Sequence, residues 1–224
     1  MDLNVVSFNN IEILNELKFN GETLLSYRIE YPVFISEHYR GSLKKINRLY
    51  MERALAFQKY CQNELFNMAV EQYKEDMQNG FPVRKFEALQ VYEVTYLFSC
   101  IISLYFDRYE FTGGAHGNTV RSSQTWNLKN CSLIALRQLV TCSPDYKAYI
   151  LADVYAQIQN EPELYFENYN ELINKTFNPR NFFCVPGGIV IYYQQYDIAP
   201  YSSGIREFLL PYTNCVKNPL TLCR

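Results

Sequence analysis

A long helical pattern of apolar residues, followed by patterns with a period of two, most constrains the fold of this chain. Between Ser42 and Gly80, apolar side chains recur every three or four residues, as on one face of an amphipathic helix. Ser42 is expected to cap the start of this helix, and Gly80 to end it, with Pro82 just beyond. We therefore expect one long helix over residues 43–79, with its apolar face in the core.

Strand patterns lie on both sides of this helix. Residues 22–35 alternate well enough for a strand, in which Pro32 marks an edge or a bend. Residues 86–98 and 101–111 are rich in Tyr, Val, Phe and Ile with a period of two, which predicts two neighbouring strands. A glycine-rich turn and another strand pattern follow, and a turn is expected at residues 127–132.

The second half of the chain returns to helices before its last strands. Ser143-Pro144-Asp145 is a strong helix start, with Ser143 as the cap, and this helix is expected to reach Gln159. A second helix is expected over residues 164–177, then a strand over 185–199 and a short strand over 208–212. The order predicts an α+β fold: a largely antiparallel sheet with one long helix and two shorter helices packed on one side of it.

Composition excludes several classes of function and bears on the compartment. The net charge is −2, so no basic stripe points to nucleic acid. The first residues do not form a signal peptide, and no apolar run is long enough for a membrane span, so as written the chain is expected to be cytoplasmic. Seven cysteines, an odd number without a Cys-x-x-Cys pair, predict free thiols in a reducing or anaerobic setting, with Cys100 as a core residue.

The segment Gly113-Gly114-Ala115-His116-Gly117 is the first candidate site. It lacks the Gly-Lys-Ser/Thr end of a phosphate-binding loop, and it precedes a strand instead of a helix. His116 has the side chain of a general base, but a hydrolase also needs an acid and a nucleophile. Asp107, Ser122 and Ser123 stand near in sequence, and Cys131 and Cys142 are possible thiol partners, but no nucleophile motif supports any of them. No cluster has the spacing of metal ligands. The simpler interpretation is a tight turn that His116 holds in place.

The segment 192–212 is the second candidate site, because it combines five tyrosines with Pro200 and Gly204. Residues 197–204 are too rich in turn formers for a strand interior. A loop that presents tyrosine and proline is typical of a surface that contacts a protein or a sugar. The alternative is a packed connection whose tyrosines fill the face of the sheet.

These two stretches together resemble a tandem found in bacterial cell-envelope proteins. The stretch from SLYFDRYEFTGGAHGN to LIALRQLV is similar to the PdaC-type domain of unknown function, and GGIVIYYQQYDIAPYSSGIREFLLPY is similar to the C-terminal domain of RsiV, a lysozyme-sensing anti-sigma factor. The resemblance spans residues 27–212. One turn departs from the family pattern Asp-Leu-x-x-Gly, since Asn127 and Cys131 stand in its first and last positions.

The resemblance implies a domain over residues 1–130 and a second over 131–224, which together are expected to form one compact unit. It also implies a non-catalytic recognition module without a cofactor. The expected partner is a lysozyme-like protein or a cell-wall glycan, and relatives act outside the cytoplasmic membrane. The alternatives are a cell-wall hydrolase using His116 and a structural domain that associates with its own copies. The residues expected to bind the partner are Gly113, Gly114, His116, Gly117, Tyr196, Pro200 and Tyr201.

Overall fold

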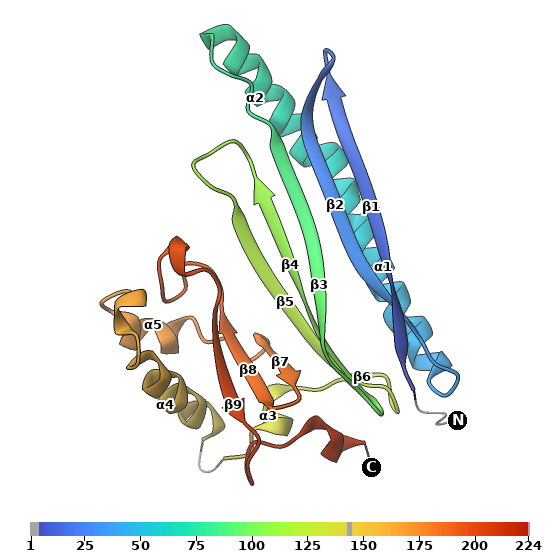
Figure 1. The fold of residues 1–224 in the computed structure, drawn as a ribbon, viewed down its shortest axis with the longest axis vertical. Coiled ribbons are helices and arrows are strands. Elements are labelled where there is room, and N and C mark those ends of the chain that lie inside the picture. Colours follow the sequence, from blue (N-terminus) through green and yellow to red (C-terminus); the bar gives the residue numbers. More distant parts are fainter. Residues whose placement is uncertain (1–4, 143–144, 224) are drawn as a thin grey trace.

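The computed structural model describes residues 5–142 and 145–223 and contains four layers. A six-stranded sheet has the order β1-β2-β3-β4-β5-β6, and a three-stranded sheet has the order β7-β8-β9. Figure 1 shows the long helix beside the large sheet at one end of the molecule, and the small sheet with α4 and α5 at the other. The predicted α+β class, with its largely antiparallel sheet and long helix, is confirmed.

The bounds of the elements follow the chain in this order. The strands and helices of the first half are β1 (Ser7–Phe19), β2 (Glu22–Ile35), α1 (Arg40–Tyr60), a π-helical turn (Cys61–Leu65), α2 (Phe66–Asn79), β3 (Phe86–Phe98), β4 (Ile101–Phe111) and β5 (Asn118–Asn127). Those of the second half are β6 (Ser132–Leu133), α3 (Leu136–Leu139), α4 (Tyr146–Ile158), α5 (Tyr169–Lys175), β7 (Phe182–Val185), β8 (Gly188–Tyr193) and β9 (Arg206–Pro211).

The long helix is continuous from α1 through the π-helical turn to α2, and it crosses one face of the large sheet. It ends as predicted at Gly80, whose φ of 68° is left-handed. Ser42 does not cap its start, because the Ser42 hydroxyl donates to the Leu128 carbonyl at 2.6 Å. This long crossover returns the chain to the sheet so that β3 pairs with β2 in parallel, the one parallel pair in the described strands.

Strand β1 was not predicted, although the sequence holds a signal for it. Asn20 and Gly21 have φ values of 51° and 88°, and they join β1 to β2 in an antiparallel hairpin. Two consecutive residues with positive φ are what a two-residue hairpin turn requires, and Asn-Gly is the preferred pair. Pro32 therefore lies in an interior strand of the sheet. Because β2 pairs with β3 only over Leu25–Ile29, the side of β2 that faces β3 is not paired with it at Pro32.

The two faces of the large sheet pack against different layers. On β5, Trp126 points to the long helix and donates to the Tyr50 hydroxyl at 2.8 Å. The adjacent Thr125 points the other way, where Ser103 and Thr125 hydroxyls lie 2.8 Å apart and the Cys184 backbone N–H of β7 donates to the Ser103 hydroxyl at 2.9 Å. The predicted arrangement of the shorter helices is therefore wrong in one respect: α4 and α5 cover the small sheet, because that sheet occupies the second face.

The small sheet also corrects the prediction of one strand over residues 185–199. Gly187 and Gly188 lie at a tight reversal, so Phe182–Val185 and Gly188–Tyr193 form an antiparallel pair. A Cβ on Gly188 would lie 2.2 Å from the Leu210 carbonyl oxygen, which explains why glycine is needed there. Helix α4 is capped by Asp145, whose carboxylate accepts from the Lys147 N–H at 2.9 Å. The predicted cap Ser143 lies outside the described residues.

The prediction that all cysteines are free thiols is wrong. Disulfides join Cys100 to Cys223 and Cys142 to Cys215, while Cys61, Cys131 and Cys184 are free. The paired residues are 123 and 73 positions apart, a connectivity that sequence spacing does not reveal. Closing loops of this length stabilises a fold by about 4 to 5 kcal/mol each through the unfolded chain. Both bonds fix the C-terminal segment to the body of the protein.

The predicted turn after β5 is confirmed, and its two departures from the family pattern are accommodated. The Asn127 side chain accepts from the Lys129 N–H at 2.9 Å, as an aspartate does at this kind of turn. Cys131 itself takes the left-handed conformation, with φ of 54°.

In the described part of the chain, no helix is both long enough and apolar enough to cross a membrane.

Candidate functional site

The fold brings the two predicted segments together. His116, in the turn between β4 and β5, stacks on Tyr201 with ring centroids 3.8 Å apart and ring planes 14° apart. The Tyr196 ring lies 6.4 Å from His116 and 6.0 Å from Tyr201. His116 and Tyr196 are exposed, and Tyr201 is half-buried. We call His116, Tyr196 and Tyr201 the aromatic cluster.

Hydrogen bonds fix the imidazole of His116 within this cluster. Its Nδ1 lies 3.2 Å from the Gly117 carbonyl oxygen, and its Nε2 lies 3.2 Å from the Tyr196 hydroxyl. These bonds are both satisfied when Nδ1 carries the proton and Nε2 accepts from the tyrosine. Since stacking and both bonds restrict the ring, the cluster presents a preorganised surface.

Two of the predicted glycines have a steric reason, and the third has none. Gly113 has φ of 80°, and a Cβ there would lie 2.9 Å from the Arg84 Cβ. A Cβ on Gly117 would lie 2.3 Å from the ring of Tyr109. Gly114 has an ordinary φ, and its nearest neighbour would be a carbonyl oxygen 4.0 Å away. The turn therefore needs glycine at its first and last positions to reach its place against β4.

The loop that carries Tyr196 is tied to the edge of β5. The Gln195 side chain accepts from the Thr119 N–H at 2.7 Å, and the Gln194 side chain accepts from the Arg121 N–H at 2.9 Å. Gln194 also donates to the Arg121 carbonyl at 2.7 Å. Two glutamine side chains thus take the place of a neighbouring strand and hold the aromatic cluster beside the β4–β5 turn.

The backbone of Tyr196 is in a strained conformation. Its φ is 66°, a left-handed value that is uncommon for a bulky residue. Such strain persists where the surroundings impose it, and it is found at binding surfaces more often than elsewhere. Pro200 is half-buried and precedes the short 3₁₀ turn Tyr201–Ser203, while the adjacent Ile198 and Ala199 are buried. Pro200 therefore shapes the loop next to the cluster.

The residues that a hydrolase would recruit are placed elsewhere. Asp107 is bonded to Arg121 between the two sheets, and the Ser123 hydroxyl donates to the Phe182 carbonyl at 2.5 Å. Among residues 5–142 and 145–223, no carboxylate lies within 4 Å of His116 in an ion pair. Nor do these residues include a group of three potential metal ligands.

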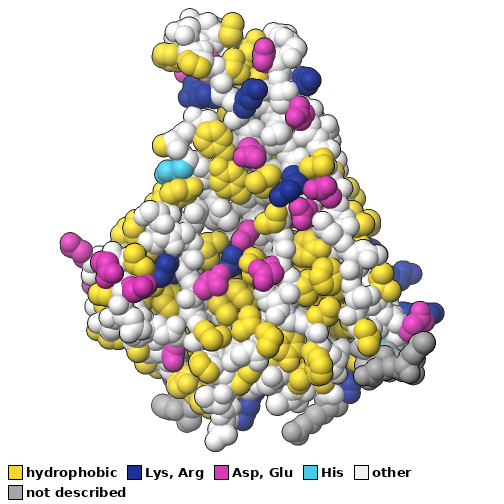
Figure 2. Space-filling model, in the orientation of Figure 1, with side chains coloured by type: hydrophobic (Ala, Val, Ile, Leu, Met, Phe, Trp, Pro, Cys, Tyr) yellow, Lys and Arg dark blue, Asp and Glu magenta, His cyan; other side chains and the backbone are white. Residues whose placement is uncertain are grey.

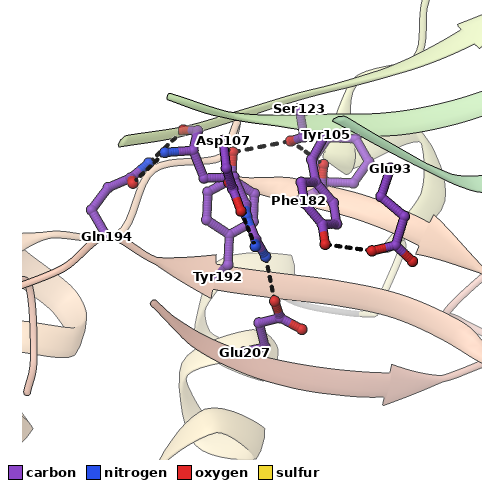
Figure 3. A network of polar contacts seen from close by, with 9 residues as sticks. Glu93, Tyr105, Asp107, Ser123, Phe182, Tyr192, Gln194 and Glu207 are labelled. Atoms are coloured by element: carbon purple, nitrogen blue, oxygen red, sulfur yellow. Dashed lines mark hydrogen bonds and ion pairs between the residues drawn. The ribbon is translucent and has the colours of Figure 1, made fainter. Parts of the chain in front are cut away.

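Sequence reasoning missed a polar network between the two sheets, shown in Figure 3. Arg121 donates to both carboxylate oxygens of Asp107 at 2.7 Å, pairs with Glu207 of β9, and lies 3.7 Å over the ring of Tyr105. Tyr105 in turn donates to Glu93 at 2.5 Å. Burial lowers the pKa of the Arg121 guanidinium, but the hydrogen bonds that it donates to Asp107 and Glu207, together with their negative charges, more than offset this effect and leave the pKa raised.

This network is a structural link between the layers. Arg121 and Asp107 are directly opposite each other in the β4–β5 hairpin, so a correct register would have predicted their ion pair. Glu207 stands 86 residues away from Arg121 in sequence, and no sequence pattern connects them.

Figure 2 shows the surface of the molecule in the orientation of Figure 1. Hydrophobic side chains cover much of this face, with acidic and basic side chains scattered among them.

Two family models match the chain in tandem. Residues 20–119 match the model described as Deacetylase PdaC, and residues 139–213 match that of a protein of unknown function, DUF3298. The peptidoglycan-N-acetylmuramic acid deacetylase PdaC of Bacillus subtilis is 21% identical over 157 residues. This alignment covers 70% of the chain but only 30% of the relative, so the chain spans less than a third of that protein's length.

Two solved structures share the fold. A DUF3298 family member from Bacteroides fragilis has a TM-score of 0.72 at 19% identity, covering 100% of this chain and 98% of that one. A DUF3298 family protein from Pseudomonas aeruginosa has a TM-score of 0.56 at 18% identity, covering 94% and 92%. At these identities the likeness concerns the fold alone. The chain therefore contains a PdaC-type domain followed by a DUF3298 domain.

Proposed function

We propose that this protein is a non-catalytic recognition module of the cell envelope, and that its aromatic cluster binds a lysozyme-like protein. The observation that carries the proposal is the assembly of His116, Tyr196 and Tyr201 from two distant segments into one exposed surface. Partner-binding surfaces are enriched in tyrosine, which contributes a large apolar area and a hydroxyl at a low cost in conformational entropy.

The state of His116 supports binding over hydrolysis. Both ring nitrogens are engaged, one by the Gly117 carbonyl and one by the Tyr196 hydroxyl. A general base needs an accessible lone pair directed at the proton that it removes. In this arrangement the ring acts as part of a rigid contact surface. We accordingly expect the protein to leave peptidoglycan fragments uncleaved.

The two disulfides support a location outside the cytoplasm. Cytosolic reductants keep thiols reduced, whereas disulfides persist in secreted and cell-surface proteins. The bonds Cys100–Cys223 and Cys142–Cys215 fix the segment after β9 and so are part of the fold. This replaces the expectation, drawn from the odd number of cysteines, of a protein with free thiols in a reducing compartment.

The similar proteins agree with a role at the cell envelope. The name of the Bacillus subtilis relative assigns that protein to peptidoglycan. The resemblance of residues 187–212 to the lysozyme-sensing RsiV family, which rests on the sequence alone, supports the same location. A lysozyme-like protein is the partner we prefer, since His116 stacks on one face of the Tyr201 ring and so leaves less of that ring for stacking on a sugar. A cell-wall glycan is the second candidate.

A calorimetric titration tests this function. A purified lysozyme and a set of muropeptides are titrated separately into the wild-type protein and into Tyr201→Ala. We expect lysozyme binding that weakens at least tenfold in Tyr201→Ala, because the stacked support of His116 is lost. Tyr155→Ala is the matched control, since Tyr155 is an exposed tyrosine on α4, outside the cluster. Equal binding by wild type and Tyr201→Ala would refute the proposed surface, and binding of muropeptides alone would identify the glycan as the partner.

A further inference from the structure

A cleft of about 840 Å³ lies along the edge of β5, apart from the aromatic cluster. Five consecutive residues of β5, Arg121 to Thr125, line it. Side chains of a strand alternate between its faces, so consecutive residues share one cleft only where the cleft runs along the strand's edge. The segments 133–137 and 178–182 form its other walls. The volume is within the range of sites for small ligands.

The charged side chains that line this cleft are all arginines. Arg53, Arg137 and Arg180 are exposed along it, and no Asp or Glu belongs to its lining. In the part of the chain that the structure describes, none of these three forms an ion pair, whereas Arg121 is neutralised by Asp107 and Glu207. Three guanidinium groups without an ion pair thus line one cleft. They favour an anionic ligand, and the planar guanidinium matches a carboxylate.

An unsatisfied acceptor in the same wall is the second observation. The Gln124 Oε1 atom is buried and has no hydrogen-bond partner among the described residues. A buried acceptor without a partner costs about 1 to 3 kcal/mol, so such atoms call for an explanation. Because this atom has almost no exposed surface, the Gln124 side chain has to turn into the cleft before it can accept from a ligand hydroxyl or amide. The amide side chains of Asn178 and Asn181 add further donors and acceptors to the lining.

The shape of the edge favours a compact ligand over a peptide strand. At one end, the Gln194 side chain occupies the N–H and carbonyl of Arg121. At the other end, the Ile134 N–H donates to the Thr125 carbonyl at 2.8 Å. The stretch between these points is about 13 Å long at the usual rise of a strand. A polypeptide cannot continue along β5 past both obstacles.

We infer that this cleft binds an acidic sugar, whose carboxylate is bound by the arginines that line the cleft, Arg53, Arg137 and Arg180, and whose hydroxyl donates to Gln124 once that side chain turns into the cleft. The ligand class follows from the combination of guanidinium groups for a carboxylate with amides and hydroxyls for a polyol. This site goes beyond the proposed contact with a lysozyme-like protein and does not depend on it, because no member of the aromatic cluster lines the cleft.

Binding of matched sugar pairs, followed by NMR, tests the inference. Glucuronate is compared with glucose, and N-acetylmuramate with N-acetylglucosamine, because the acidic member of each pair carries a carboxylate that its neutral partner lacks, in N-acetylmuramate as part of a lactyl ether. We expect the acidic member of at least one pair to bind and to shift the side-chain amide signal of Gln124, while its neutral partner binds at least tenfold more weakly. The two pairs distinguish a general acidic sugar from a cell-wall sugar. Arg137→Gln and Arg53→Gln should each weaken binding about tenfold, since each removes one charged donor.

Two control variants distinguish sugar binding in the cleft from a general loss of positive charge and from binding at the aromatic cluster. Arg48→Gln changes an exposed arginine on α1 that is paired with Glu52 outside the cleft, and it should bind acidic sugars as the wild type does. Tyr201→Ala should also keep this binding, so failure of one proposal leaves the other intact. Equal binding of neutral and acidic sugars, unchanged binding in Arg53→Gln and Arg137→Gln, or the absence of any sugar binding would each overturn the inference.

Discussion

At the scale of single residues, the three glycines of the turn between β4 and β5 differ in whether the structure requires a glycine at their position. Gly113 needs a left-handed backbone and contacts the aliphatic part of Arg84, while Gly117 lies against the ring of Tyr109. A Cβ on Gly114 would meet only a carbonyl oxygen at an ordinary contact distance of 4.0 Å. All three were predicted to serve the site, but only the first and last are required by the geometry of the turn.

Substitutions in this turn are therefore expected to differ. Gly113→Ala should lower the free energy of unfolding by about 1 to 2 kcal/mol, because a Cβ at φ of 80° is strained and approaches Arg84. Gly114→Ala should change it by less than about 0.5 kcal/mol, as expected of an unconstrained surface position. Urea unfolding followed by circular dichroism measures both. Equal losses in the two variants would contradict the steric account.

At the scale of elements, the end of α2 is joined to the glycine turn through one buried carboxylate. Asp76 is fully buried and accepts from the Arg84 Nε at 3.0 Å and from the Gln72 side chain at 3.2 Å. The hydrogen bonds from Arg84 lower the pKa of Asp76 below its usual value, and they outweigh the opposite effect of its burial. The aliphatic part of Arg84 lies next to Gly113, so the Asp76–Arg84 pair supports the glycine turn.

This pair predicts a dependence of stability on pH. Because the folded-state pKa of Asp76 is lowered, its contribution is present above the unfolded value of about 4 and is lost as the pH falls through the folded value. Asp76→Asn should be less stable than the wild type at pH 7, and the difference should shrink below about pH 4. Glu71→Gln, which changes an exposed carboxylate paired with Lys74 on the same helix, should show little difference at either pH. A gap between Asp76→Asn and wild type that stays constant with pH would contradict the role of the carboxylate.

The elements also show what the sequence can predict. Strands 86–98 and 101–111 and the long helix were predicted closely, since their apolar periods are clean and long. Strand β1 was missed although Ile11, Ile13, Leu17 and Phe19 alternate with polar residues, because Leu14 and Asn15 interrupt the pattern and most of the strand is exposed. In the small sheet, β9 was predicted and β8 was predicted too long, as residues 185–199, whereas β7 was missed because it has four residues and only Pro186 and Gly187 separate it from β8.

The candidate site was predicted only in part. The two segments that form the aromatic cluster were selected by their turn formers and tyrosines, but their contact depends on Gln194 and Gln195 binding the edge of β5 across more than 70 residues. The Arg121–Glu207 pair and the arginine-lined cleft depend on the same packing of the two sheets. Contacts between distant strands carry no local signal, which is why sequence patterns did not find them.

At the scale of the whole molecule, the disulfides fasten the C-terminal segment to both halves. Cys100 lies at the β3–β4 turn and Cys142 precedes α4, and their partners Cys223 and Cys215 both follow β9. One core cluster includes buried residues from β2 to Val216. The PdaC-type and DUF3298 parts thus share a hydrophobic core, and the predicted division at residue 130 stays a prediction.

Alkylation with mass spectrometry tests this arrangement of cysteines. Burial raises the pKa of Cys61 and of Cys184 to about 12, so both should resist alkylation in the native protein at neutral pH. Cys131 is half-buried and should react first. Three alkylated cysteines are expected after denaturation without reductant, and seven after reduction. Seven before reduction would contradict the disulfides.

The aromatic cluster as a partner-binding surface is tested most directly by observing the two histidines of the chain, His38 and His116. In the protein labelled with ¹³C, each imidazole gives its own NMR signals, and His38, which packs edge-on against Tyr39 before α1, serves as the internal reference. On addition of an unlabelled lysozyme, the account predicts that the His116 signals shift or broaden while those of His38 stay in place. If the His116 signals remain unchanged at saturating lysozyme, the aromatic cluster is not the surface that binds it.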